Sequence, residues 1–308
     1  MVASHRSAAP LLFPHLQASI RAGDAFVSTI VATGLRGSPV LKPMVQLLGV
    51  IALGYVLLCA TIYAAQERLL FFPEYDPPGT QYNVGWPVEE AFIPVEGATL
   101  HALWFRTTNP AGVILYFHGN GGSLRSWGAV APDFIVRGYD VVMVDYRGYG
   151  QSSGSISHEA QLLADADAVY DWMLARYPEE HIVLYGRSLG TSLAAWLAAN
   201  RQPRLLLLES PLYSVEAIAR RQFPWVPSVL LKYPLRTHSW IERVRCPVVI
   251  IHGTDDTIIP ISDGEQLAAH VTAPLAFYRI TGGGHNNLAA FDLYYHALDI
   301  ALGTPRQP

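Results

Sequence analysis

From about residue 89 onward, short apolar runs rich in β-branched and aromatic residues alternate with stretches of helical periodicity. This alternation is typical of a mostly parallel β-sheet with crossover helices packed on its faces. We expect eight strands, at residues 91–95, 99–105, 112–117, 141–144, 182–185, 205–208, 248–251 and 275–280. The helical stretches lie at residues 123–137, 160–176, 188–201, 261–270 and 287–301. A chain of 308 residues has room for one large α/β domain with an appendage, but not for two such domains.

Ahead of this domain, residues 45–65 contain no charged side chain and are long enough to cross the hydrocarbon core of a bilayer. The composition agrees, because 51% of the chain is hydrophobic and only 15% is charged. No small-residue cleavage site follows this run, so we expect an uncleaved transmembrane anchor at 45–65. Residues 1–44 then form an N-terminal segment, and residues 66–308 form the α/β domain.

The charges on the two sides of the anchor differ. Both signs follow it, whereas basic residues outnumber acidic ones before it. The preceding charges are Arg6, Arg21, Arg36 and Lys42, against the single acid Asp24. By the positive-inside rule, we expect a single-pass membrane protein whose N-terminus is cytoplasmic. The α/β domain would then lie on the outer side, in a periplasm, a lumen or the extracellular space.

Residues 186–190 read Gly-Arg-Ser-Leu-Gly and match the pattern G-x-S-x-G. The pattern stands between the strand expected at 182–185 and the helix expected at 188–201. In such a strand-to-helix turn the serine is presented to substrate, and the flanking glycines relieve crowding around it. We therefore expect Ser188 to be a nucleophile.

A serine hydroxyl needs an adjacent base, and in this architecture the acid and then the histidine follow on loops after later strands. His285 follows the strand at 275–280, and we expect it to be the base. Two acids, Asp255 and Asp256, follow the strand at 248–251. We favour Asp256, because the H-G-x-x-D spacing carries it past the strand end to a loop position facing a histidine. Asp255 remains the alternative.

A glycine-dense turn at residues 118–123, His-Gly-Asn-Gly-Gly-Ser, follows one expected strand and precedes an expected helix. An oxyanion hole takes one of its donors from such a turn. We expect the backbone N–H groups of Asn120 and Leu189 to be the donors, with Gly121 as the alternative to Asn120. We interpret His118 as a structural residue. Neither G-K-[ST] nor G-x-G-x-x-G occurs here, which argues against a phosphate cradle.

Two further segments between the expected strands have a recognisable composition. In the glycine-containing loop at 145–152 we expect scaffold residues, with an ion pair between Asp145 and Arg147. The segment 211–244 is rich in proline and aromatic residues and interrupts the alternation of strands and helices. We expect this segment to form a lid inserted into the domain.

Several classes of function and cofactor are disfavoured. The formal net charge of −4 provides no basic footprint for nucleic acid. The spacing of the 2 cysteines suggests no metal site. Acyl transfer by a serine nucleophile requires neither a metal nor an organic cofactor, so we expect none.

Five ordered segments together resemble the α/β-hydrolase superfamily. They are YFHGNGGS at 116–123, VDYRGYGQSSG at 144–154, YGRSLG at 185–190, IHGTDD at 251–256 and GGGHNN at 282–287. The resemblance extends over about residues 68–302, and it is closer to a membrane-anchored branch that includes lysophospholipid lipases and protein depalmitoylases. It implies an α/β-hydrolase fold with a Ser–Asp–His triad, but it does not identify the substrate.

We therefore expect a serine hydrolase that cleaves carboxylic esters or thioesters through an acyl-enzyme. Its partners would be a small-molecule ester or lipid substrate and the bilayer, which residues 45–65 contact. An apolar lid on an anchored domain favours lipid-like acyl groups, because each buried methylene contributes about 0.8 kcal/mol. The alternatives are a peptidase, a protein depalmitoylase and a non-catalytic scaffold that retains the hydrolase fold.

Overall fold

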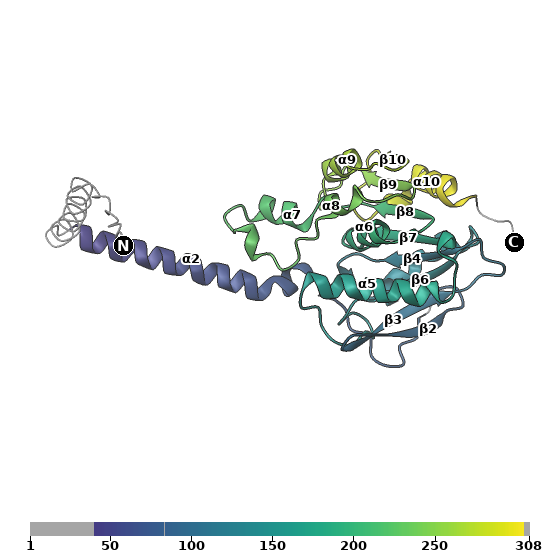
Figure 1. Ribbon diagram of the computed structural model, residues 1–308, viewed down its shortest axis with the longest axis horizontal. Helices are drawn as coiled ribbons and strands as arrows, with labels where there is room; N and C mark the ends of the chain where they lie inside the picture. The colour runs from purple at the N-terminus through teal and green to yellow at the C-terminus, as the bar shows by residue number, and fades with distance from the viewer. Residues whose placement is uncertain (1–39, 83, 305–308) are drawn as a thin grey trace, which may run out of the picture. The chain divides into compact units, whose positions relative to one another are not determined.

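The computed structural model describes residues 40–82 and 84–304, so most of the predicted N-terminal segment lies outside the described residues (Figure 1). The chain divides into two compact units, Met1–Thr61 and Ile62–Pro308. Helix α2, Leu41–Leu70, begins in the first unit and ends in the second. At 1.5 Å per residue its 30 residues extend about 45 Å. It is the one helix in the described part of the chain that is long and apolar enough to span a membrane.

The second unit is built on an eight-stranded sheet with the strand order β10-β9-β8-β7-β4-β6-β3-β2. The strands are β2 Glu89–Val95, β3 Ala98–Phe105, β4 Val113–Phe117, β6 Asp140–Val144, β7 Ile182–Arg187, β8 Leu205–Glu209, β9 Val248–Gly253 and β10 Leu275–Ile280. All neighbours from β6 to β10 pair in parallel, and β3 pairs antiparallel with both β2 and β6. The predicted mostly parallel, eight-stranded α/β sheet is confirmed.

Side chains along the central strands alternate between two apolar cores, as the two-residue period of a strand requires. In β4, for example, Leu115 belongs to the core that α5 Glu159–Leu174 and α6 Gly190–Asn200 cover. Tyr116 belongs to the core that α4 Pro132–Ile135 and α10 Asp292–Leu302 cover. The longer helices on the two faces are α5 Glu159–Leu174, α6 Gly190–Asn200, α9 Ile261–Ala269 and α10 Asp292–Leu302 (Figure 1). Because both faces are covered, the central strands read as continuous apolar runs.

The prediction of one continuous helix at 123–137 is wrong. The structure has α3 Leu124–Trp127, a 3₁₀ turn η1 Gly128–Val130 and α4 Pro132–Ile135 in its place. Pro132 explains the break, because proline is tolerated in the first turn of a helix but lacks the N–H that would continue the previous one. Likewise the stretch at 287–301 consists of η4 Leu288–Ala290 followed by α10.

The segment 211–244 joins β8 to β9 and contains α7 Val215–Gln222, η3 Ser228–Leu230 and α8 Thr237–Ile241. A 3₁₀ turn, η2 Glu179–His181, precedes β7. A second, two-stranded sheet that the sequence did not predict joins β1 Phe72–Pro73 in parallel to β5 Gly121–Gly122. It attaches the chain that leaves helix α2 to the glycine-dense turn after β4.

Candidate active site

Ser188 lies in the tight turn between β7 and α6. Its φ of 52° is in the left-handed region that a residue with a side chain rarely adopts. The turn is packed so closely that a Cβ at Gly186 would lie 2.5 Å from the carbonyl oxygen of Gly190. A Cβ at Gly190 would lie 2.1 Å from the carbonyl oxygen of Phe117. Only glycine fits at both positions, and the surrounding strands thereby hold Ser188 in a strained conformation.

Ser188, His285 and Asp256 form one chain of hydrogen-bond contacts. The Oγ of Ser188 lies 3.0 Å from Nε2 of His285. The Nδ1 of His285 lies 2.7 Å from Oδ2 of Asp256. An ionised carboxylate can only accept, so Nδ1 carries the ring hydrogen and Nε2 is left to accept from the serine hydroxyl. This is the geometry of a nucleophile, its base and a third group that orients the base.

The two neighbouring acids occupy different environments. Asp256 is 6% exposed, and its Oδ1 accepts from the amide N–H groups of Ile258 and Ile259, at 2.9 and 2.8 Å. Asp255 is exposed, and its Oδ1 accepts from the hydroxyl of Thr254 at 2.8 Å. The structure therefore brings Asp256 to His285 and leaves Asp255 in a solvent-facing turn.

Hydrogen bonds keep the Asp256 carboxylate charged. Burial by itself raises its pKa, but hydrogen bonds from His252, His285 and the Ile259 amide hold the pKa well below its usual value. Because the pKa is lower in the folded state, the resulting stabilisation is present above the unfolded-state pKa of about 4 and is lost as the pH falls below it.

Acidification is expected to remove this stabilisation. Below pH 4, the free energy of unfolding should fall more steeply for the native protein than for Asp256→Asn, by up to about 1.4 kcal/mol per pH unit. Denaturant titrations of both full-length proteins in detergent, at pH 6, 4 and 3, measure the difference. The same pH dependence in both proteins would contradict this assignment.

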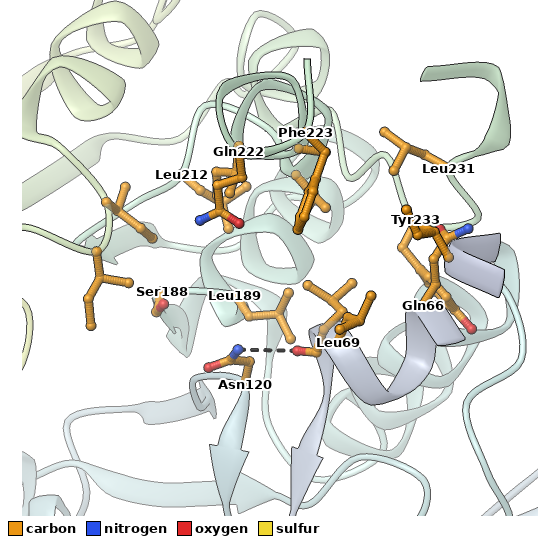
Figure 2. Close-up of a pocket in the computed structure, with 17 residues that line it drawn as sticks. Gln66, Leu69, Asn120, Ser188, Leu189, Leu212, Gln222, Phe223, Leu231 and Tyr233 are labelled. Atoms are coloured by element: carbon orange, nitrogen blue, oxygen red, sulfur yellow. Dashed lines mark hydrogen bonds between the residues drawn. The ribbon is translucent and has the colours of Figure 1, made fainter. Parts of the chain in front are cut away.

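The turn after β4 presents backbone donors rather than side chains. The Nδ2 of Asn120 donates to the carbonyl of Leu70, the last residue of α2, at 3.1 Å (Figure 2). The Asn120 carbonyl accepts from the amide of Phe72 at 2.9 Å and from the hydroxyl of Tyr149 at 2.7 Å. Among the described residues, no hydrogen bond occupies the amide N–H of Asn120 or Leu189. Both groups are available to an oxyanion.

The predicted ion pair between Asp145 and Arg147 is wrong. Arg147 instead forms two contacts with Asp165 of α5, at 2.5 and 2.7 Å. Asp145 is fully buried, accepts from the amide of Leu124 at 3.2 Å and lies 3.4 Å from Nε2 of His118. The oxygens of Asp145 are therefore already engaged behind the turn, whereas Asp165 offers the guanidinium a bidentate partner.

Arg187 is a site residue that the sequence reasoning missed. Its Nε lies 3.2 Å from Oε1 of Glu209. Its Nη2 donates to the carbonyl of His285 at 3.3 Å and to Oδ1 of Asn286 at 3.2 Å. Arg187 thus links the turn that holds Ser188 to the loop that holds His285. The available signals were an arginine directly before Ser188 and an acid at the end of the next strand.

A cavity of about 240 Å³ extends from Ser188, and none of its 17 lining residues carries a charge (Figure 2). The residues come from the end of α2, the turn after β4, the turn that holds Ser188, the segment 211–244 and the loop after β9. They are Ile62, Gln66, Leu69, Leu70, Asn120, Ser188, Leu189, Leu212, Val215, Ile218, Ala219, Gln222, Phe223, Leu231, Tyr233, Ile258 and Ile259. Such a lining favours an apolar ligand group beside Ser188.

The eight-stranded α/β sheet and the hydrogen-bonded Ser188, His285 and Asp256 are typical of α/β hydrolases. Comparisons with known proteins agree with this class. A family model described as alpha/beta hydrolase fold matches residues 112–240. The uncharacterized protein Rv2307c of Mycobacterium tuberculosis is 31% identical over 260 residues, which cover 81% of this chain and 90% of that protein. The chain therefore belongs to the α/β-hydrolase superfamily, as the sequence motifs predicted.

Other relatives share part of their length with this chain. Alpha/beta hydrolase domain-containing protein 17B of Xenopus laevis is 33% identical over 60% of this chain and 64% of that protein. Lysophosphatidylserine lipase ABHD12 of Danio rerio is 31% identical over 63% of this chain and 56% of that protein. The solved structure of the Pyrococcus furiosus esterase Pf2001 has a TM-score of 0.61 at 17% sequence identity. The match covers 75% of this chain and 97% of that chain, and it shows that the two share a fold. Together they agree with the assignment of this chain to the α/β-hydrolase superfamily.

Proposed function

We propose that this protein is a serine hydrolase that cleaves carboxylic esters or thioesters through an acyl-enzyme. The observation that carries the proposal is the hydrogen-bonded chain from Ser188 through His285 to Asp256. In the first step, Nε2 of His285 takes the hydroxyl proton while the Ser188 oxygen bonds to the carbonyl carbon. His285 then returns the proton to the leaving alcohol or thiol as its bond breaks. Water deprotonated by His285 releases the acid and regenerates Ser188.

The negative charge that develops on the carbonyl oxygen requires donors that are already in place. The amide N–H groups of Asn120 and Leu189 are proposed to fill this role, because both lie beside Ser188 along the cavity and neither is occupied within the described residues. A single donor of this kind contributes about 3 kcal/mol to stabilising the transition state. Asp256 keeps the imidazole in the required tautomer and stabilises the imidazolium.

The proposed substrates carry lipid-like acyl groups. The uncharged cavity beside Ser188 supports this, because each methylene it removes from water contributes about 0.8 kcal/mol. A relative named as a lysophosphatidylserine lipase points to the same class of single-chain lipid ester. The segment 211–244, which supplies nearly half of the lining residues, is proposed to act as the lid over the acyl chain.

A graded series of p-nitrophenyl esters, from acetate to dodecanoate, tests this assignment with the full-length protein in detergent micelles. Catalytic efficiency, kcat/KM, is expected to rise with chain length over several methylenes, because the cavity is apolar along its length. Ser188→Ala measures the background. A preference for acetate over all longer esters would contradict the proposal of lipid-like acyl substrates.

The protein is proposed to be anchored in a membrane by residues 45–65, with a cytoplasmic N-terminus and the hydrolase domain on the outer side. The length and composition of α2 and the excess of basic residues before it support this orientation. In sealed vesicles whose cytoplasmic face is outward, added protease should remove an N-terminal tag and leave the hydrolase domain intact. Digestion of the domain with protection of the tag would reverse the orientation.

A further inference from the structure

The last two turns of helix α2 form one wall of the cavity beside Ser188. Ile62, Gln66, Leu69 and Leu70 line it, at the spacing i, i+4, i+7 and i+8 that places residues on one face of a helix. Three of these side chains are aliphatic, and the fourth is the polar Gln66. A polar amide among apolar neighbours is costly to bury unless both of its ends are hydrogen-bonded.

Gln66 is 8% exposed, and both ends of its amide contact the backbone of one short stretch of the segment 211–244. Its Nε2 donates to the carbonyl of Leu230 at 2.7 Å, and its Oε1 accepts from the amide of Lys232 at 2.8 Å. Leu230 is the last residue of the 3₁₀ turn η3, and Lys232 follows it outside regular secondary structure. The Gln66 side chain therefore satisfies one backbone acceptor and one backbone donor of this stretch, as the backbone of a neighbouring strand would do.

Glu67, the next residue of the helix, strengthens the same attachment. Its carboxylate accepts from Nζ of Lys232 at 3.0 and 3.2 Å and from the hydroxyl of Tyr233 at 2.9 Å. Between the two peptide groups that Gln66 binds stands Leu231, whose side chain lines the cavity. Leu231 also borders a second cavity of about 30 Å³ that shares Ile62 and Phe223 with the first.

Ser188 and Leu231 lie at opposite ends of the cavity, with Leu189 and Leu69 between them (Figure 2). An acyl chain attached at Ser188 would therefore reach Leu231 only when it is several methylenes long. A group that fixes Leu231 would leave acetyl esters unaffected and would act on longer ones. This position separates chain selection from the chemistry at the nucleophile.

We propose that Gln66 is a specificity-determining positioning residue, through which the end of helix α2 fixes the far wall of the acyl-chain site. The ligand is the distal part of a medium or long saturated acyl chain. Helix α2 thus contributes directly to substrate selection in addition to any role as an anchor. The inference rests on the proposed function, because it concerns which esters reach Ser188 productively.

The test replaces Gln66 in the full-length protein with methionine, which has similar length and helix propensity but cannot form either hydrogen bond. The measured quantity is the ratio of kcat/KM for p-nitrophenyl dodecanoate to that for p-nitrophenyl acetate, in detergent micelles. Gln66→Met should lower this ratio about tenfold, because the dodecanoate chain reaches the wall that Gln66 fixes and the acetyl group does not. Arg68→Met is the matched control, because Arg68 is exposed on the same helix and does not line the cavity.

A second variant, Gln66→Glu, keeps the size of the side chain and the acceptor for Lys232 but loses the donor to Leu230. It should lower the ratio in the same direction, so the test stands even where the methionine variant folds poorly. A native protein that prefers acetate would overturn the lipid-like substrate and with it this inference. A native preference for dodecanoate with an unchanged ratio in both Gln66 variants would overturn the role of Gln66 alone.

Discussion

Ser188→Ala is expected to lower kcat for ester hydrolysis by about 10⁴–10⁶-fold. The reason is that Ser188 is the one group whose oxygen would bond to the substrate carbonyl, so its loss removes the acyl-enzyme route entirely. The remaining rate would come from binding and from the backbone donors. The surrounding turn sets the strained φ of 52°, and alanine at this position would keep it, so the melting temperature should change little.

A second substitution shows whether Ser188 and His285 act as one unit. His285→Ala should cause a loss of similar size, because Nε2 of His285 is the only base within 3.0 Å of the Ser188 hydroxyl among the contacts of the described residues. The double variant should then be little worse than either single variant. Multiplicative losses would show that the two residues work independently, which would contradict the proposed mechanism.

Asp256→Asn is expected to lower kcat by about 10⁴-fold, while Asp255→Asn should change it less than threefold. The amide oxygen of the new asparagine would still accept from Ile258 and Ile259, which turns its NH₂ group toward His285. Nδ1 of His285 would then have to accept, and the ring hydrogen would move to Nε2. In that tautomer His285 cannot accept the Ser188 proton.

The comparison of the two neighbouring acids is informative because they carry the same charge one residue apart. Both asparagine variants remove one negative charge from the loop after β9, so a general electrostatic effect would lower kcat equally in both. Steady-state kinetics on a p-nitrophenyl ester measures the two losses. A large loss in Asp255→Asn with a small one in Asp256→Asn would exchange the two roles.

The strands were predictable because burial on both faces leaves continuous apolar runs, and all eight predicted runs correspond to strands of the sheet. The G-x-S-x-G turn was recognisable because its close packing leaves no room for a Cβ at Gly186 or Gly190, so both positions require glycine. The helix at 123–137 was mispredicted because the helical spacing of apolar residues continues through Pro132, whereas a continuous helix cannot.

Partners distant in sequence were harder to predict. Arg147 finds Asp165, 18 residues along the chain, and no local pattern announces that contact. Gln66 and Lys232 are separated by 166 residues, so the attachment of helix α2 to the segment 211–244 becomes visible only in the fold. The separation of Asp255 from Asp256 depends on which way each side chain leaves the turn after β9, and the spacing alone favours one without excluding the other.

Covalent labelling with a fluorophosphonate tests whether Ser188 is an activated nucleophile. The folded full-length protein should form one adduct, which peptide mass spectrometry should locate on Ser188. Heat-denatured protein and Ser188→Ala should form none, because activation depends on His285 in the folded site. The absence of an adduct on the folded protein, or an adduct on another serine such as Ser152 or Ser153, would show that Ser188 is not the activated nucleophile.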